Sequence, residues 1–365
     1  MPILSYLKAL NRAIAAEMER DPAVCVFGED VRVAVSNVTT GLVKKFGPER
    51  VVDMPISEQA FTSFATGAAL SGQRPLIEFQ IPALLFLAFE QIANQAHKFS
   101  LMTGGQATVP VTYLLPSSGS RGGWAGQHSD HPYSLFAHVG VKTVVPSTPA
   151  DAYGLLVSAI RDDDPVVVFA PAGAVGVRAD VDLAALEPIP LGVGRVHRRG
   201  EDVTVVAIGH LVHDALAVAE ELDGTVSVEV FDPRTLHPFD WAGLAASLER
   251  TGRLVVVDDS NRSCGMAGEI LASAAEGMRL VAPPRRVTRP DGAVLPFARE
   301  LDLALQPSRA QIRAAIEDVA KLDLALRPEA QNRAAIDDVA KLDLALRPEA
   351  QNRAAIDDVA KLTET

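Results

Sequence analysis

The chain has 365 residues, of which 48% are hydrophobic and 22% are charged, a composition typical of an ordinary globular protein. Single cores seldom grow past about 250 residues, so we expect two domains. The 34 basic and 46 acidic residues give a net charge of −12, which argues against a surface for nucleic acid or for an anionic membrane.

Cysteine content and the N-terminal sequence predict a soluble, cytoplasmic protein. The two cysteines, Cys25 and Cys264, cannot form a disulfide framework, and we expect both to be buried, inert thiols because each lies in or near an apolar stretch. The N-terminus shows no basic-then-apolar leader, and no apolar run has the length of a membrane span.

The first half of the chain alternates helical and strand patterns, which predicts a parallel sheet covered on both faces. Strands are expected at 24–27, 51–52, 76–80, 109–115, 141–145 and 165–169, and helices at 3–20, 39–46, 62–70, 83–102 and 149–161. Composition changes at 170–176 and again at 187–190, so we place a domain boundary there. A second, smaller α/β domain is expected from strands at 202–208, 226–230 and 253–258 and from helices at 213–222 and 268–276.

The C-terminal tail contains a repeat. Residues 302–322 read DLALQPSRAQIRAAIEDVAKL, and the related segment DLALRPEAQNRAAIDDVAKL then occurs twice, at 323–342 and 343–362. Proline near the start of each copy and apolar residues at helical spacing predict three helices. We expect the first copy to pack on the body of the protein and the other two to be a tandem duplication. The predicted domains are therefore 1–175, 187–322 and a repeated helical tail at 323–365.

Two acidic residues lie where a parallel sheet usually binds ligands. Glu29 follows the strand at 24–27, and Glu58 follows a strand that Pro55 ends. Ser57 can cap the next helix, which places Glu58 at a strand-to-helix junction facing a cleft. The ordinary alternative is a first-turn glutamate that only favours the helix dipole.

Several motifs in the same order and at similar spacing make the chain resemble a known family. They are Gly28-Glu-Asp-Val31, Pro55-Ile-Ser-Glu-Gln59, Gln127-His-Ser129, Ser158-Ala-Ile-Arg-Asp162, Gly200-Glu-Asp-Val-Thr204, Val212-His-Asp-Ala-Leu216 and Thr251-Gly-Arg-Leu-Val-Val-Val257. Residues 4 to 322 resemble the beta subunit of the thiamine-diphosphate-dependent 2-oxo acid dehydrogenases of pyruvate and branched-chain type. The resemblance implies a pyrimidine-binding domain followed by a transketolase C-terminal-type domain.

The resemblance also implies roles for individual residues. Glu58 would bond the aminopyrimidine ring nitrogen of thiamine diphosphate and favour the imino form that activates the cofactor. Glu29, Gln80 and Leu84 would line the cofactor cleft, and His128 would transfer a proton or orient the substrate. For His128 the ordinary alternative is a loop histidine bonded to a backbone carbonyl, and for His131 the two interpretations are evenly matched.

A metal site and partners follow from the same resemblance. A structural potassium site is implied at Val111, Ala159, Ile160, Asp162 and Asp164, whose oxygens suit a hard cation; alternatively, the acidic turn at 162–164 only caps a helix. The implied assembly is a two-alpha, two-beta heterotetramer that passes the acyl group to a lipoyl arm on an acyltransferase component. The chain has no Gly-Asp-Gly motif followed by asparagine, so magnesium and the diphosphate must be held by the alpha-type subunit.

Two departures from the family pattern concern the substrate and the acyl acceptor. Leu84 stands where the family usually has an aromatic residue that stacks on the aminopyrimidine, although Phe79 or Phe86 can compensate. Ser129-Asp-His131 departs from the commoner His-Ser-Gln pattern, which would fit an enzyme whose acyl acceptor is a carrier other than a lipoyl domain.

Two alternative functions stay open. The first is the C-terminal half of a split transketolase, which would need several phosphate-binding basic residues at the cleft; Arg121 is the one such candidate in the loop before His128. The second is a non-catalytic scaffold that keeps the fold while the tail repeats bind a partner. Glu58 and His128 argue against a scaffold.

Overall fold

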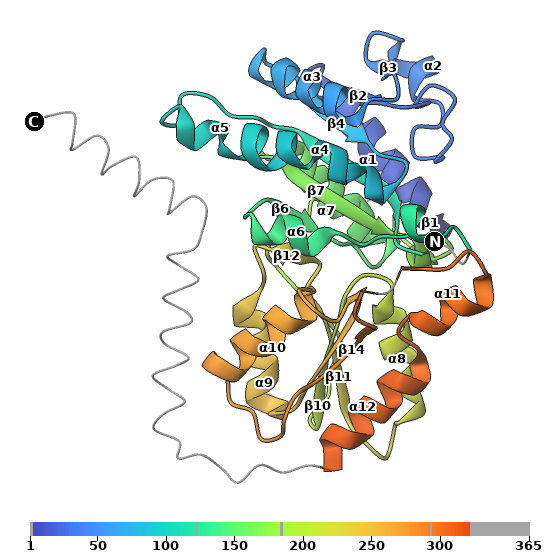
Figure 1. Cartoon of the computed structure of the whole chain (residues 1–365), viewed down its shortest axis with the longest axis vertical. Helices are drawn as coiled ribbons and strands as arrows, with labels where there is room; N and C mark the ends of the chain where they lie inside the picture. The colour runs from blue at the N-terminus through green and yellow to red at the C-terminus, as the bar shows by residue number, and fades with distance from the viewer. Residues whose placement is uncertain (1–2, 121–122, 183–184, 293, 322–365) are drawn as a thin grey trace, which may run out of the picture.

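The chain forms two α/β domains, one above the other in Figure 1. The computed structural model describes residues 3–120, 123–182, 185–292 and 294–321. The extra tail copies at 323–365 and Arg121 lie outside the described residues. Within them, no helix is long and apolar enough to cross a membrane.

The first domain contains a seven-stranded sheet in the order β12-β6-β7-β5-β4-β2-β3. Its strands are β2 (Val24–Gly28), β3 (Val51–Asp53), β4 (Arg74–Glu78), β5 (Thr112–Ser118), β6 (Lys142–Val144), β7 (Val166–Pro171) and β12 (Thr235–His237). All neighbours pair in parallel except β12, which is antiparallel to β6. The main helices are α1 (Tyr6–Arg20), α2 (Leu42–Phe46), α3 (Glu58–Leu70), α4 (Leu85–Glu90), α5 (His97–Met102), α6 (Tyr133–His138) and α7 (Pro149–Arg161).

The second domain contains a five-stranded sheet in the order β14-β13-β10-β11-β9. Its strands are β9 (Arg195–Arg198), β10 (Val203–Ala207), β11 (Val228–Asp232), β13 (Leu254–Asn261) and β14 (Arg285–Arg289). The helices are α8 (Leu211–Glu221), α9 (Trp241–Thr251), α10 (Met266–Gly277), α11 (Arg299–Leu305) and α12 (Arg309–Lys321). A short antiparallel pair, β1 (Ile3–Ser5) with β8 (Arg178–Asp180), lies outside both sheets.

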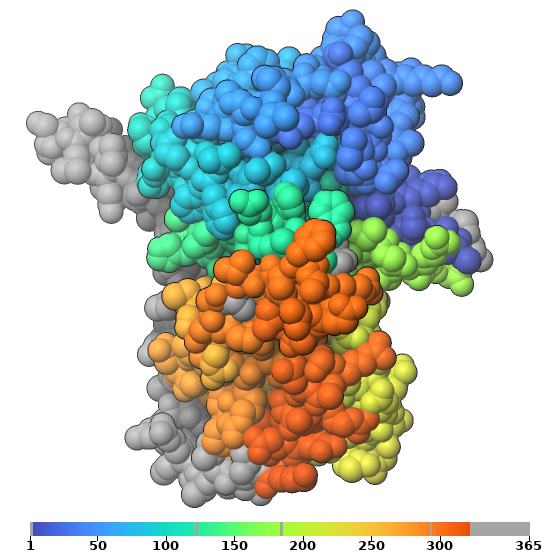
Figure 2. Space-filling model, turned by 45° about the vertical axis from the view of Figure 1, so that its right-hand side comes forward, coloured from blue at the N-terminus to red at the C-terminus, as the bar shows by residue number. Residues whose placement is uncertain are grey.

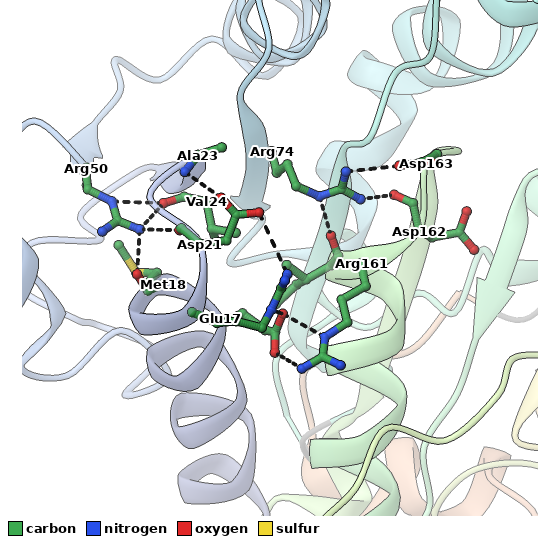
Figure 3. Close-up of polar contacts among 12 residues, drawn as sticks. Glu17, Met18, Asp21, Ala23, Val24, Arg50, Arg74, Arg161, Asp162 and Asp163 are labelled. Carbon is green, nitrogen blue, oxygen red and sulfur yellow. Dashed lines mark hydrogen bonds and ion pairs between the residues drawn. The ribbon is translucent and has the colours of Figure 1, made fainter.

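Helices α1 and α7 pack side by side against one face of the first sheet. The carboxylate of Glu17 in α1 accepts hydrogen bonds from Nε of Arg161 in α7 at 2.9 Å and from Nη2 at 2.7 Å (Figure 3). Because Glu17 is 1% exposed, burial raises its pKa, but Arg161 and Arg20 lower it below its usual value. The ion pair fixes one layer of the domain, and helix α3 packs on the opposite face, where Phe61 and Ala65 join the larger core.

The two domains also share a strand. Strand β12 lies in the chain between β11 and α9, yet it completes the sheet of the first domain by pairing with β6. Nearby, the Ser147 hydroxyl donates to Asp232 Oδ2 at 2.5 Å, and Arg234 Nη2 lies 2.6 Å from Asp151 Oδ1. Both aspartates are fully buried, so this polar junction is sealed from water.

Most of the expected helices and strands are present, although the bounds of several differ from the predicted ones. The helix predicted at 149–161 coincides with α7, and Thr148 caps it by accepting a hydrogen bond from the Asp151 backbone N–H. Ser57 was expected to cap α3 in the same way, and this is wrong: its φ of −165° and ψ of 81° differ from those of Thr148, and its side chain makes no capping bond.

The single helix expected at 83–102 is interrupted. A 3₁₀ turn, η1 (Pro82–Leu84), precedes α4, and a π-helical segment, η2 (Gln91–Ala96), joins α4 to α5. The wider π turn accommodates one extra residue, so that Ile92, Ala93 and Ala96 all face the core.

The expectation for the two thiols is half right. Cys25 is buried in β2, and burial raises its pKa to about 12. Cys264 is exposed, with a φ of +59°, because it lies in the turn after β13 rather than in the strand. As expected, the first copy of the repeat packs on the body: Ile312, Ile316 and Val319 of α12 are buried in the core of the second domain.

Candidate active site

The carboxyl ends of three neighbouring strands bring the predicted cofactor residues together. Glu29 follows β2, Glu58 follows β3 as the first residue of α3, and Gln80 lies two residues after β4. Because β2 lies between β3 and β4 and all three are parallel, these residues share one edge of the sheet, where α/β proteins bind ligands. The approach of β2 to β4 requires Gly28, since a Cβ there would lie 2.6 Å from the Glu78 carbonyl oxygen.

Two carboxylates lie near each other at this edge, and the charge of Glu58 acts on Glu29. Glu58 is 4% exposed, and no salt bridge engages it within the described part of the chain. Burial raises the pKa of Glu29, and the negative charges of Glu58 and Asp30 raise it further. The Glu29 backbone carbonyl accepts a hydrogen bond from Gln80 Nε2 at 2.8 Å, whereas its buried Oε1 has no hydrogen-bond partner among the described residues. An unpartnered buried acceptor beside a second buried carboxylate fits a polar ligand that donates hydrogen bonds, as an aminopyrimidine does.

A further buried carboxyl, which sequence reasoning missed, lies behind this pair. Glu78 ends β4 and is 2% exposed. Burial raises its pKa to about 7, partly offset by a hydrogen bond with Ser36, and its Oε2 has no hydrogen-bond partner in the described chain. No alternation could have revealed it, since β4 is buried on both faces and Glu78 shares its face with the buried Leu76.

Leu84 lies in η1, partly buried against the core of the first domain. The two proposed aromatic substitutes occupy different environments. Phe79 is 1% exposed and packs against the Phe61 ring at 5.3 Å, so its ring is already enclosed by the core. Phe86 is half exposed on α4. A stacking role for either ring stays a prediction.

His128 lies at the end of a short turn, η3 (Gly126–His128), which contacts η1. Its Nδ1 lies 3.1 Å from the Trp124 carbonyl oxygen, and its ring meets the Trp124 indole edge-to-face with centroids 6.1 Å apart. If Nδ1 donates to that carbonyl, Nε2 is the acceptor nitrogen, which is the form required of a general base. Ala125 has a φ of +63°, an unusual conformation that is compatible with a functional loop.

His131, three residues on, is buried between the domains. Its Nδ1 lies 3.0 Å from Ser118 Oγ and its Nε2 lies 3.5 Å from Asp259 Oδ2. Arg289 binds the same aspartate with two hydrogen bonds, from Nε at 2.7 Å and from Nη2 at 3.0 Å. Burial lowers the pKa of His131 to about 3, so it is neutral at physiological pH. Because Ser118 is fully buried, this Ser-His-Asp arrangement is suited to joining the domains and not to nucleophilic attack.

The five residues of the implied potassium site gather around the turn between α7 and β7. Their oxygens already have protein partners. Lys142 Nζ binds both oxygens of Asp162 at 2.8 and 2.9 Å and reaches Asp164 Oδ2 at 3.1 Å. Although burial lowers the pKa of Lys142, these two carboxylates raise it above its usual value.

Backbone oxygens of the same turn are also engaged. Arg74 donates to the Ile160 carbonyl at 3.0 Å and to the Asp162 carbonyl at 2.6 Å (Figure 3). The carbonyls of Val111 and Ala159 each accept one backbone hydrogen bond. The donor set is all oxygen and fits a hard monovalent cation, but Lys142 already supplies positive charge there.

Comparison with known proteins identifies the class to which this architecture belongs. Residues 3–177 match the transketolase pyrimidine-binding domain and residues 192–312 match the transketolase C-terminal domain. The fold resembles that of a split-gene transketolase described as an inactive beta4 tetramer, with a TM-score of 0.72 and 22% identity over 88% of this chain and 99% of that one.

Proteins related in sequence identify the family within this class. The chain is 39% identical over 342 residues to the beta subunit of acetoin:2,6-dichlorophenolindophenol oxidoreductase of Cupriavidus necator, covering 87% of this chain and 98% of the relative. It is 42% identical over 290 residues to the 3-methyl-2-oxobutanoate dehydrogenase beta subunit of Mycobacterium tuberculosis, covering 78% and 83%. It is 38% identical over 307 residues to the pyruvate dehydrogenase E1 beta subunit of Staphylococcus epidermidis, covering 82% and 93%. The chain therefore belongs to the family of 2-oxo acid dehydrogenase beta subunits, as its motifs predicted.

Proposed function

We propose that this chain is the beta subunit of a heteromeric enzyme that decarboxylates a 2-oxo acid with thiamine diphosphate and passes the acyl group to a lipoyl or other carrier. The observation that carries the proposal is the pair formed by the buried Glu58 and the partly buried Glu29 at the carboxyl edge of the sheet, with the buried Glu29 Oε1 unpartnered in the described chain. The 3-methyl-2-oxobutanoate and pyruvate dehydrogenase subunits named above support the same class of activity.

The chain's own residues provide acid–base control in this half of the site. When bound, the cofactor supplies the carbon nucleophile and the electron sink for decarboxylation. Glu58 would hold a proton against the aminopyrimidine ring nitrogen, and its burial strengthens that interaction. Glu29, whose raised pKa makes it more readily protonated, would accept or donate a second hydrogen bond beside it. Gln80 orients Glu29 through its backbone carbonyl.

His128 and Leu84 would act on the substrate side and the cofactor side of the cleft. The contact between η3 and η1 places the two segments next to each other. Leu84 would pack on the pyrimidine ring without the aromatic stacking contribution, and His128 would use Nε2 to move a proton at the reacting carbonyl or at the acyl acceptor.

The half-site needs a partner subunit. Apolar side chains near Glu58 are unusually exposed for a monomer, namely Ile56 at 84%, Phe64 at 55% and Phe86 at 50%. An alpha-type subunit would cover them in a two-alpha, two-beta heterotetramer and would hold magnesium and the diphosphate.

The test is co-expression with the alpha-type subunit, followed by measurement of carbon dioxide release from a panel of 2-oxo acids with thiamine diphosphate and magnesium. Release from at least one oxo acid is expected. Ketol transfer between phosphosugars without oxo acid decarboxylation would instead show a split transketolase. Neither activity, together with no cofactor binding by the assembled complex, would show a scaffold.

We propose that a potassium ion binds at the turn of Asp162 and Asp164, in addition to the ammonium group of Lys142 that already pairs with both carboxylates. Lys142→Met leaves both carboxylates without their ammonium partner, so potassium should stabilise the variant more than the parent. The measurement is the melting temperature of each protein in potassium chloride and in choline chloride at equal ionic strength. Equal melting temperatures in the two salts for both proteins would refute the potassium site.

A further inference from the structure

We propose that Asp302 is a positioning residue that fixes the His128 loop from the second domain; this rests on the proposed role of His128. Asp302 lies on α11 and is fully buried. Its Oδ2 accepts hydrogen bonds from Ser120 Oγ at 2.5 Å and from the Gly123 backbone N–H at 2.9 Å, and its Oδ1 accepts from Gln306 Nε2 at 2.9 Å. Both loop residues belong to the first domain, 179 or more positions earlier in the chain.

The charge on Asp302 makes these contacts strong. Hydrogen bonds to an ionised acceptor are about twice as strong as neutral ones, and burial keeps water from competing for the same oxygens. A positive charge lies in the same interior: burial lowers the pKa of Arg289, but Asp259 raises it above its usual value, with smaller contributions from Tyr133 and Asp302. A buried carboxylate that lost its loop donors would keep its desolvation cost, so the loop and α11 stabilise each other.

The segment that leads into α11 also packs against the loop. A Cβ at Gly123, whose φ is +100°, would lie 3.0 Å from the Phe297 carbonyl oxygen. A Cβ at Gly126 would lie 2.6 Å from Val294 Cγ1. In Figure 2 the orange surface of this part of the second domain lies directly against the green surface of the first domain. The positive φ and the nearby backbone oxygen favour glycine at position 123, whereas a Cβ at position 126 would require the exposed Val294 side chain to move.

The other end of the loop is fixed separately. The Gly119 N–H donates to the Asp130 carbonyl at 3.1 Å, and His131 packs so closely on Gly119 that a Cβ there would lie 2.1 Å from its Nε2. His128 lies between this base and the Asp302 contacts. Loss of the Asp302 carboxylate would thus release one side of the loop while the base stays anchored.

Trp124 reports on this loop without any need for catalysis, because it lies in the loop and contacts the His128 ring. The other tryptophan, Trp241, is in α9, so a Trp241→Phe background leaves Trp124 as the single indole. In the full chain, Asp302→Asn should raise the acrylamide quenching constant of Trp124 and lower its fluorescence anisotropy. Asp318→Asn is the matched control, since Asp318 on α12 binds Arg285 and has half-exposed side-chain surface.

Ser120→Ala provides a second variant that leaves α11 intact and removes one donor to Asp302. It should change Trp124 in the same direction, and it decides the matter if Asp302→Asn does not fold. In the complex with the alpha-type subunit, Asp302→Asn should lower kcat about tenfold to a hundredfold with an unchanged KM for the oxo acid.

Parent-like quenching and anisotropy in the folded loop variants would overturn the proposal. Absence of decarboxylation by the assembled parent enzyme would count against the proposed function alone, since the fluorescence result would still decide whether Asp302 fixes the loop.

Discussion

Replacement of Glu58 by glutamine should lower kcat of the assembled enzyme by about 10²–10⁴-fold, the range typical of a lost general acid–base group. Glutamine keeps the size and the hydrogen-bonding capacity of the side chain but cannot hold or give up the proton that the aminopyrimidine requires. Glu58 is the first residue of α3 and is 4% exposed, so the change is confined to a site that the structure already encloses. Carbon dioxide release under single-turnover conditions measures the effect on chemistry.

The matched control is Glu276→Gln, on the exposed face of α10 in the second domain. It removes the same charge in a different domain from Glu58. The variant should therefore keep the parental kcat. Glu58→Gln should still assemble with the alpha-type subunit, as checked by size-exclusion chromatography. A Glu58→Gln enzyme with parental kcat would refute the assignment of Glu58.

The second large effect is on stability. Because Glu78 has a pKa of about 7 in the folded chain and an ordinary value of 4.5, the folded state binds its proton more tightly than the unfolded state. Stability from this group is therefore fully present below pH 4.5 and is lost as the pH rises through 7. A difference of 2.5 pKa units corresponds to about 3 kcal/mol. Glu78→Gln should remove most of this pH dependence, so that the variant is less sensitive than the parent between pH 5 and pH 8.

Chemical denaturation at pH 5 and pH 8 measures the difference, with Glu249→Gln, an exposed residue of α9, as the control. The free energy of unfolding of the parent and of the control should fall between the two pH values by a similar amount. An equal fall for Glu78→Gln would show that Glu78 is ionised in the folded chain at both pH values.

Local signals predicted much of the first sheet and the positions of its acidic residues. The valine-rich strands and the small-residue helix after Pro55 place Glu29 and Glu58 at one edge, because parallel neighbours end together. The motifs around these residues indicated the family to which the chain belongs, and the comparisons confirm that family. The boundary between the two domains stays a prediction.

Features that depend on contacts between distant parts of the chain could not be predicted from the sequence. Strand β12 has only three residues and an antiparallel partner about 90 positions earlier, so no periodicity marks it. Asp302 falls within a helical repeat whose pattern predicts only packing, and its contacts with Ser120 and Gly123 appear only when the chain closes on itself. The buried state of Arg289 depends likewise on Asp259, which lies 30 residues away on the neighbouring strand.

The contribution of β12 to the sheet of the first domain limits how the protein can move. A hinge rotation that separated the two halves would have to break the pairing of β12 with β6 and expose the buried aspartates beside it. Any movement between the domains must therefore keep β12 paired with β6. Thermal unfolding of the two halves should be coupled for the same reason, since the sheet of the first domain is completed by a strand from the second half of the chain.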